Sequence, residues 1–245
     1  LTGIFPVTPL EGDEQGVIHG ATAITNGDLR YWDLRYLYEI QPGSYLAISG
    51  LARLTGASTE HTFAWLSVGG ALLFAAGTAL LVQRLLRAPW PLAALAVLLS
   101  QEIWAAAYYL NTTAVGGWLA LLAVLLALKP LTLLRSFAVA GLLAVAGWMR
   151  IDCLLISPAV AAIVWWRQPL LQPFLREIVP VTLLALLLCA GLYLGCGVNP
   201  LGLSAIYSTR NVEGWPRTFQ MYFYLTSSLV GVLSLVGLGW MAWQR

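Results

Sequence analysis

Charged side chains are scarce in this chain. They make up 10% of its 245 residues, whereas an ordinary soluble domain carries roughly 25%. Hydrophobic residues account for 59% of the chain, which is more apolar surface than a water-soluble fold of this length can bury. We therefore expect an all-α polytopic membrane protein surrounded by membrane lipid. The net charge is only +2 and lysine and arginine do not cluster, so nucleic acid is not expected as a partner.

Cysteine is rare as well, and its spacing excludes a disulfide framework. Cys189 and Cys196 lie seven positions apart in one apolar run, about 10 Å along a helix, which is too far for a disulfide bond. We expect all three cysteines to be core or lipid-facing residues. The chain starts without methionine and ends within an apolar run at Arg245, and we expect it to be part of a longer protein.

The acidic residues that are present gather near the N-terminus, where seven of the eleven lie in the first sixty positions. Because charge is kept out of the lipid, residues 1–60 are predicted to form a first external loop that carries short interfacial helices. This acidic segment, rich in aromatic residues, is the part of the chain that we expect to carry chemistry.

Two short helices are predicted within this loop. Apolar residues at helical spacing predict the first over residues 14–25, with Asp13 at its start and a turn signal at Asn26-Gly27-Asp28. The second is predicted to begin at Gln41-Pro42-Gly43 and to end at Leu54. At about 18 Å it is too short to cross a membrane and is expected to lie flat or to dip in.

Residues 61–245 are predicted to form a transmembrane helical domain with a second external loop at 199–217. Several of its apolar stretches are shorter than the roughly 20 residues that cross a bilayer upright, so tilt or local thinning is expected. Gly191 and Gly195 form a small-residue pair that predicts close helix packing. The predicted spans, about seven in number, are 63–82, 92–110, 114–128, 137–148, 154–166, 179–198 and 219–243.

Charge in the short loops predicts the orientation. If the spans alternate from residues 1–60 onward, one side receives short loops that are rich in arginine and lysine and have Glu177 as their only acid. Such loops mark the cytoplasmic side, so residues 1–60 are expected outside the cytoplasm. The cations of the cytoplasmic side are Arg84, Arg87, Lys129, Arg135, Arg167, Arg176 and Arg245.

One pattern of residues resembles a known family. Asp13-Glu14 is followed by a short helix ending in Asn-Gly-Asp, then aromatic residues, then Gln-Pro, then an apolar stretch that closes on Leu-Thr-Gly. The likeness continues in AAAYYLN up to Asn111 and in AGWMRIDCLLISP from Ala146 to Pro158. This pattern resembles the GT-C superfamily of membrane glycosyltransferases, and within it the protein O-mannosyltransferase and aminoarabinose-transferase type.

The resemblance implies an enzyme of the bacterial inner membrane. It would move a sugar from a polyprenyl-phosphate-linked donor to a lipid, glycan or protein acceptor on the non-cytoplasmic face. By the same resemblance the acid of the first loop works at the reaction centre, a role carried here onto Asp13 with Glu14 beside it. Asn111 stands where the family has a second acid, which leaves the family's metal arrangement open, and Glu102 is the nearby acid that would compensate.

The residues themselves allow the same assignments. A carboxylate such as Asp13 can take the acceptor's proton, although aspartate is also a preferred N-cap. Glu14 is a second catalytic candidate, with a first-turn acid favoured by the helix dipole as the alternative. Glu102 lies inside an apolar stretch, and an acidic residue in such a stretch is interpreted as part of a functional site. A divalent metal ion held by Asp13 and Glu102, with Glu14 beside them, is a further hypothesis, because hard cations take oxygen ligands.

Cationic side chains are needed to bind the donor's phosphate. Arg150 lies between two apolar runs, and Arg210 lies in the second external loop together with Tyr207. Guanidinium groups match phosphate geometry in a bidentate way. The alternative for Arg150 is an interfacial charge pair with Asp152.

Two other functions stay open. The first is a transporter or lipid-handling protein without catalysis, which predicts ionisable residues near the bilayer midplane and an internal repeat. The acids collect at one face instead, which favours the enzyme. The second is a GT-C relative that has lost activity, which Asn111 keeps open.

Overall fold

The computed structural model describes residues 13–27, 41–87, 89–98 and 113–202. Within these ranges every regular element is a helix, which confirms the all-α class for this part of the chain. The predicted span 219–243 lies outside the described residues, and the count of seven spans stays a prediction. In chain order the elements are α1 (Asp13–Thr25), α3 (Pro42–Thr55), α4 (Thr59–Leu86), α5 (Trp90–Leu98), α7 (Thr113–Ala127), α8 (Leu133–Met149), η1 (Ile151–Ile156), α9 (Ser157–Arg167), α10 (Leu171–Gly195) and η2 (Pro200–Gly202).

The two short helices predicted near the N-terminus are confirmed. α1 begins at Asp13 and ends at Thr25, and the turn after it has Gly27 at a φ of 81°. α3 begins with Pro42, whose missing N–H costs nothing in a first helical turn. It ends at Gly56, which has a φ of 69° and donates its backbone N–H to the carbonyl of Ala52.

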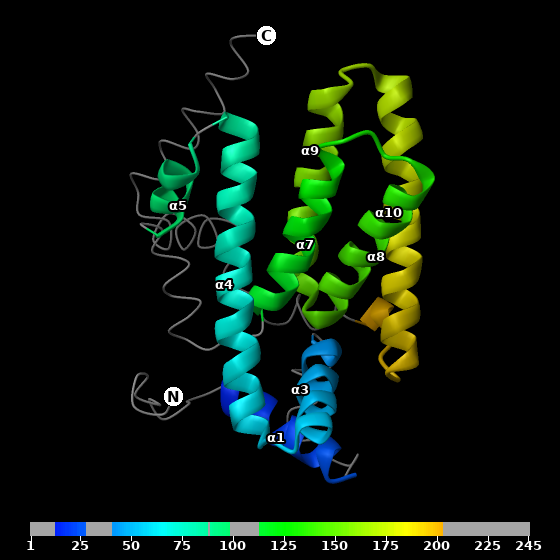
Figure 1. Ribbon diagram of the computed structural model, residues 1–245. Helices are drawn as coiled ribbons and strands as arrows, with labels where there is room; N and C mark the ends of the chain where they lie inside the picture. The colour runs from blue at the N-terminus through cyan, green and yellow to red at the C-terminus, as the bar shows by residue number, and fades with distance from the viewer. Residues whose placement is uncertain (1–12, 28–40, 88, 99–112, 203–245) are drawn as a thin grey trace, which may run out of the picture.

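The apolar face of α1 packs onto the rest of the molecule. Val17, Ile18 and Ala21 are buried, while Gln15 and His19 are exposed, as the periodicity predicted. The buried face joins a cluster that includes residues of α3, α4, α8 and α10. Figure 1 shows α1 and α3 together beside the lower end of the bundle. α1 and α3 therefore form a layer that caps one end of the bundle.

Among the described residues, two helices are long and apolar enough to cross a membrane, judged by length and composition. They are Thr59–Leu85, within α4, and α10, with mean hydropathies of 1.9 and 2.3 in their most apolar windows. The 28 residues of α4 extend about 42 Å, more than the ~30 Å hydrocarbon core of a bilayer. Only 28% and 22% of the two windows are buried, so most of their apolar surface faces outward.

The shorter helices coincide with other predicted spans. α7 matches the predicted span 114–128 almost residue for residue, and α8 begins four residues earlier than the predicted start at Phe137. The predicted span 154–166 differs more, because residues 151–156 form the 3₁₀ helix η1 before α9 starts at Ser157. Pro158 explains the boundary, since proline lacks an N–H donor and fits only the first turn of an α-helix.

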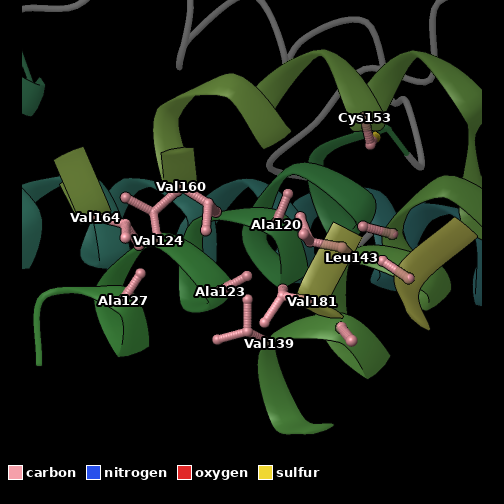
Figure 2. Packing of buried hydrophobic residues seen from close by; sticks show 13 residues of the cluster. Ala120, Ala123, Val124, Ala127, Val139, Leu143, Cys153, Val160, Val164 and Val181 are labelled. Atoms are coloured by element: carbon pink, nitrogen blue, oxygen red, sulfur yellow. The ribbon is translucent and has the colours of Figure 1, made fainter. Parts of the chain in front are cut away.

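Small side chains bring α7, α8, α9 and α10 close together. Ala120, Ala123 and Ala127 of α7 are fully buried against Val139 and its neighbours on α8. Figure 2 shows this cluster, with Val160 and Val164 of α9 and Val181 of α10 beside the alanines of α7. Alanine and valine at these positions allow the helix backbones to approach closely.

Within the described residues, glycine allows close packing on α4. A Cβ atom at Gly70 would lie 2.6 Å from Val115 Cγ2, and one at Gly77 would lie 2.8 Å from Leu121 Cδ2. Gly191 and Gly195 are exposed, with open space where a Cβ atom would lie. No described residue packs closely on Gly191 or Gly195, and because the predicted span 219–243 lies outside the described residues, their packing role stays a prediction. α4 and α7 use glycine to approach each other.

The helices run alternately up and down the bundle, which separates its charges. Figure 1 shows the last turns of α4 and α9 and the first turns of α8 and α10 at the end of the bundle opposite α1 and α3. Arg84 and Arg167 belong to those last turns, and Arg135 and Arg176 lie near the starts of α8 and α10. These predicted cytoplasmic cations thus lie at one end, and the N-terminal layer lies at the other.

Candidate substrate-binding region

Arg150 lies at a break between two helices. α8 ends at Met149, and Arg150 has an extended backbone with φ −162° and ψ 125° before η1 begins at Ile151. Its backbone N–H donates to the carbonyl of Ala146 over 3.0 Å, and its own carbonyl accepts a bond from the N–H of Cys153. The backbone of Arg150 is thereby tied to both helices, and the residue is half-buried at the end of the bundle occupied by α1 and α3.

Two side chains from other helices bind the last carbonyls of α8. The hydroxyl of Ser44 in α3 donates to the carbonyl of Met149 over 2.7 Å, and the hydroxyl of Tyr193 in α10 donates to the carbonyl of Gly147 over 2.9 Å. Both bonds are buried. The last carbonyls of a helix have no partner within it, so these bonds satisfy groups that would otherwise be costly to bury.

Trp148 completes the join between α3, α8 and α10. Its indole Nε1–H donates to Cys196 Sγ over 3.2 Å. A Cβ atom at Gly43 would lie 2.8 Å from the carbonyl oxygen of Trp148 and 2.7 Å from its ring, so α3 reaches α8 only because glycine occupies position 43. Ser44, Tyr193, Trp148 and Gly43 together fix the position of the chain at Arg150.

An apolar cavity of about 230 Å³ lies between η1, α8, α9 and α10. Leu154 of η1, one helical turn beyond Arg150, belongs to its wall. Pro158 and Leu186, which also line it, are exposed, so the cavity reaches the outer surface of the bundle. Among the described residues that line it, the polar side chains are those of Ser157 and Thr182. The remaining lining residues are Leu143, Val160, Ala161, Ile178, Val181 and Ala185. A cationic residue thus lies close along the chain to an apolar cavity suited to hydrocarbon.

Asp13 and Glu14 are the first two residues of α1. Their side chains lie outside the part of the structure that is described. Ile18 of α1 belongs to the same hydrophobic cluster as Ala144, Trp148 and Ile151, which flank Arg150 in sequence. The helix that carries the two predicted catalytic acids therefore packs at the same end of the bundle as Arg150.

The far end of α1 is held by side chains from α3 and α4. Arg53 donates from Nε to the carbonyl of Thr25 over 3.1 Å, and its NH2 group donates to the carbonyls of Thr25 and Ile24. Thr25 donates to Ser49 Oγ over 3.0 Å, and Thr22 shares a hydrogen bond with Thr59. Arginine at a helix C-terminus also interacts favourably with the helix dipole, so Arg53 stabilises the helix that begins with Asp13.

The other predicted site residues lie outside the described residues. They are Glu102, Asn111, Tyr207 and Arg210. Among the residues that the structure does describe, no three His, Cys, Asp or Glu side chains lie close enough together to hold a metal ion. The predicted ligands Asp13 and Glu102 fall outside that search, so the metal site stays a hypothesis.

Sequence reasoning did not find Ser44, Tyr193 or Arg53 as residues that shape this region. Of the three, Tyr193 carries a local signal. Tyr193 is the only polar aromatic residue in the apolar run of α10, and a buried tyrosine hydroxyl usually finds a hydrogen-bond partner. Arg53 lies in the last turn of α3, which gives no indication that it reaches α1. None of the three cysteines forms a disulfide, Cys153 and Cys189 are buried as predicted, and Cys196 is half-buried.

No protein-family model, no curated protein and no solved structure matches this chain. The part of the chain that the structure describes is an all-helical bundle with two helices of membrane-spanning length and a helical layer over one end.

Proposed function

We propose that the protein is an integral membrane glycosyltransferase of GT-C type. It transfers a glycosyl unit from a polyprenyl-phosphate-linked donor to a lipid, glycan or protein acceptor on the non-cytoplasmic face. In this proposal the helices form about seven spans in a bacterial inner membrane, and residues 1–60 lie outside the cytoplasm. The supports are the family resemblance of the N-terminal segment, the low burial of α4 and α10, and the region around Arg150.

The observation that carries the proposal is the pairing of Arg150 with an apolar cavity whose wall begins one turn further along the chain. A polyprenyl phosphate is a hydrocarbon chain with an anionic head. Guanidinium groups bind phosphate oxygens with charge-assisted hydrogen bonds, and an apolar cavity shelters hydrocarbon. We assign the phosphate to Arg150, with Arg210 and Tyr207 of the second external loop as further partners, and the tail to the cavity.

The transfer then needs one proton acceptor. The acceptor's hydroxyl or amine attacks the anomeric carbon, the bond between that carbon and the phosphate oxygen breaks, and polyprenyl phosphate leaves. Asp13 receives the acceptor's proton as general base, with Glu14 beside it. Arg150 stabilises the charge that develops on the leaving phosphate. Asp13 and Glu102 are the residues that would hold a divalent metal ion, which would polarise the phosphate.

Reconstituted vesicles test the proposal. The protein is incorporated into vesicles with a radiolabelled polyprenyl-phosphate sugar in the bilayer and a membrane lipid extract as the source of acceptor. The proposal predicts label in a new product and release of polyprenyl phosphate. Movement of the labelled lipid between leaflets without a new product would support the lipid-handling alternative, for which the apolar cavity is the favouring feature. If no new product forms and the labelled lipid does not move between leaflets, both functions are overturned.

A further inference from the structure

The end of the bundle opposite the N-terminal layer carries a positively charged surface formed by two turns. The α7–α8 turn and the α9–α10 turn meet there. Arg167 donates from NH1 to the carbonyl of Ala127 over 2.8 Å and also to the carbonyl of Lys129, and the backbone N–H of Leu131 donates to Glu177 Oε2 over 3.4 Å. These bonds hold the two turns side by side.

The only acid in these two turns is neutralised within the protein. Glu177 forms an ion pair with Arg167, and Gln168 donates to its other carboxylate oxygen. Lys129, Arg135 and Arg176 remain as positive charge, and within the described residues no ion pair involves any of them. Lys129 and Arg176 are exposed, whereas Arg135 is half-buried and donates to the carbonyl of Pro130. We call Lys129, Arg135 and Arg176 the basic surface.

Exposed apolar residues flank the basic surface. Leu133 and Leu134 at the start of α8 are 78% and 80% exposed, and Leu170 and Leu171 at the start of α10 are 66% and 64% exposed. Both turns therefore pair two leucines with cations. Trp166 at the end of α9 is also exposed, and tryptophan favours the headgroup zone of a bilayer. This combination fits the boundary where hydrocarbon meets charged headgroups.

We propose that the basic surface binds the headgroups of anionic phospholipids, with the four leucines in contact with their acyl chains. The inference rests on the membrane placement in the proposed function but not on the transfer reaction. Anionic lipid is the partner because the surface combines a net positive charge with exposed leucines at the same turns. A soluble anion would match the charge and leave the leucines in water. Clusters of cations beside spans attract anionic leaflets in this way.

The test compares lipid preference in nanodiscs. The full chain is reconstituted into nanodiscs of phosphatidylcholine, with and without phosphatidylglycerol, and the lipids retained after detergent extraction are identified by native mass spectrometry. We expect wild-type protein to retain phosphatidylglycerol over phosphatidylcholine. Lys129→Gln/Arg176→Gln should lower that preference by about fivefold for each cation removed. Raising the salt concentration should weaken the wild-type preference.

The matched control is Arg84→Gln/Arg87→Gln, which removes two exposed cations from the end of α4. Its two cations lie at the same end of the bundle but outside the basic surface, so this variant should lower the preference less than Lys129→Gln/Arg176→Gln does. An equal loss in both double variants, or no loss in Lys129→Gln/Arg176→Gln, would overturn the proposal. If that variant does not fold, Lys129→Gln and Arg176→Gln are measured singly. Failure of wild-type protein to enter nanodiscs of either composition would instead contradict the membrane placement itself.

Discussion

The hydroxyl of Ser44 donates a hydrogen bond of 2.7 Å to the carbonyl oxygen of Met149, across 105 positions of the chain. This buried bond joins the N-terminal layer to the residue that precedes Arg150. It links the two parts of the molecule to which the proposed chemistry is assigned, since α1 and α3 pack together and Arg150 follows Met149 directly.

Ser44→Ala should destabilise the protein by about 1–3 kcal/mol, because the Met149 carbonyl loses a buried hydrogen-bond donor. It should also lower the rate of sugar transfer, because the chain at Arg150 becomes less well held. Thermal unfolding in detergent measures the first effect and the transfer assay measures the second. Ser136→Ala on α8 is the control, since no hydrogen bond of its side chain occurs among the described residues. Equal melting temperatures for the two variants would contradict the role of Ser44.

Gly43 and Gly50 lie in the same helix, α3, and their alanine variants can be compared directly. Gly43→Ala would place a Cβ atom 2.8 Å from the carbonyl oxygen of Trp148, whereas Gly50→Ala meets nothing within 4 Å. We expect the first variant to lose about 1–3 kcal/mol through overpacking. The second should be neutral or gain up to about 1 kcal/mol, because alanine favours a helix over glycine. Chemical denaturation of both variants measures the difference, and a loss in Gly50→Ala as large as in Gly43→Ala would show that α3 does not approach α8 as described.

The ion pair of Arg167 and Glu177 should stabilise the opposite end of the bundle. The two side chains are 18% and 19% exposed, so removing one partner leaves a mostly buried charge. Arg167→Gln and Glu177→Gln should each cost about 2 kcal/mol. A double-mutant cycle isolates their coupling, and Arg84→Gln serves as a surface control that should change little. Additive single effects in the cycle would contradict a direct interaction.

Arg150→Gln should weaken the handling of the donor. Loss of a charge-assisted hydrogen bond to phosphate costs about 1.5–3 kcal/mol, or roughly 10- to 100-fold in kcat/KM for the donor. Arg150→Lys should recover part of the loss, since lysine keeps the charge without the bidentate geometry. Steady-state kinetics with varied donor concentration measures the effect, alongside melting temperature to exclude a folding defect. An unchanged kcat/KM in a folded Arg150→Gln protein would remove Arg150 from the donor site.

Local patterns were sufficient to predict much of this fold. The periodicity of Val17, Ile18 and Ala21 predicted α1 and its buried face, and the predicted ends of α3 at Pro42 and Leu54 agree with the observed Pro42–Thr55 to within one residue. These features depend on residues a few positions apart, so the sequence displays them directly.

The joins between helices could not be predicted in the same way. Ser44 and Tyr193 act on the end of α8 across 105 and 46 positions, and no local pattern encodes the partner of a hydroxyl. Spacing likewise shows that Gly191 and Gly195 share a face of α10 but not which helix that face meets. Of the candidate site, the sequence indicated Arg150 from its place between two apolar runs, and the cavity beside it required the packing of four elements.

The most direct test of the proposed function is the transfer activity of Asp13→Asn. Asparagine keeps the shape of the side chain and its ability to cap a helix, but it cannot take a proton from the acceptor. Glu60→Gln is the control, since it removes an exposed acid from the first turn of α4, beside the same layer. The variant proteins are reconstituted with labelled polyprenyl-phosphate sugar, and their melting temperatures are compared with that of the wild type.

Asp13→Asn should fold normally and lose transfer by about 10²- to 10⁴-fold, the usual contribution of a general base, while Glu60→Gln keeps wild-type activity. Full transfer by a folded Asp13→Asn protein would contradict the assignment of Asp13 as the base.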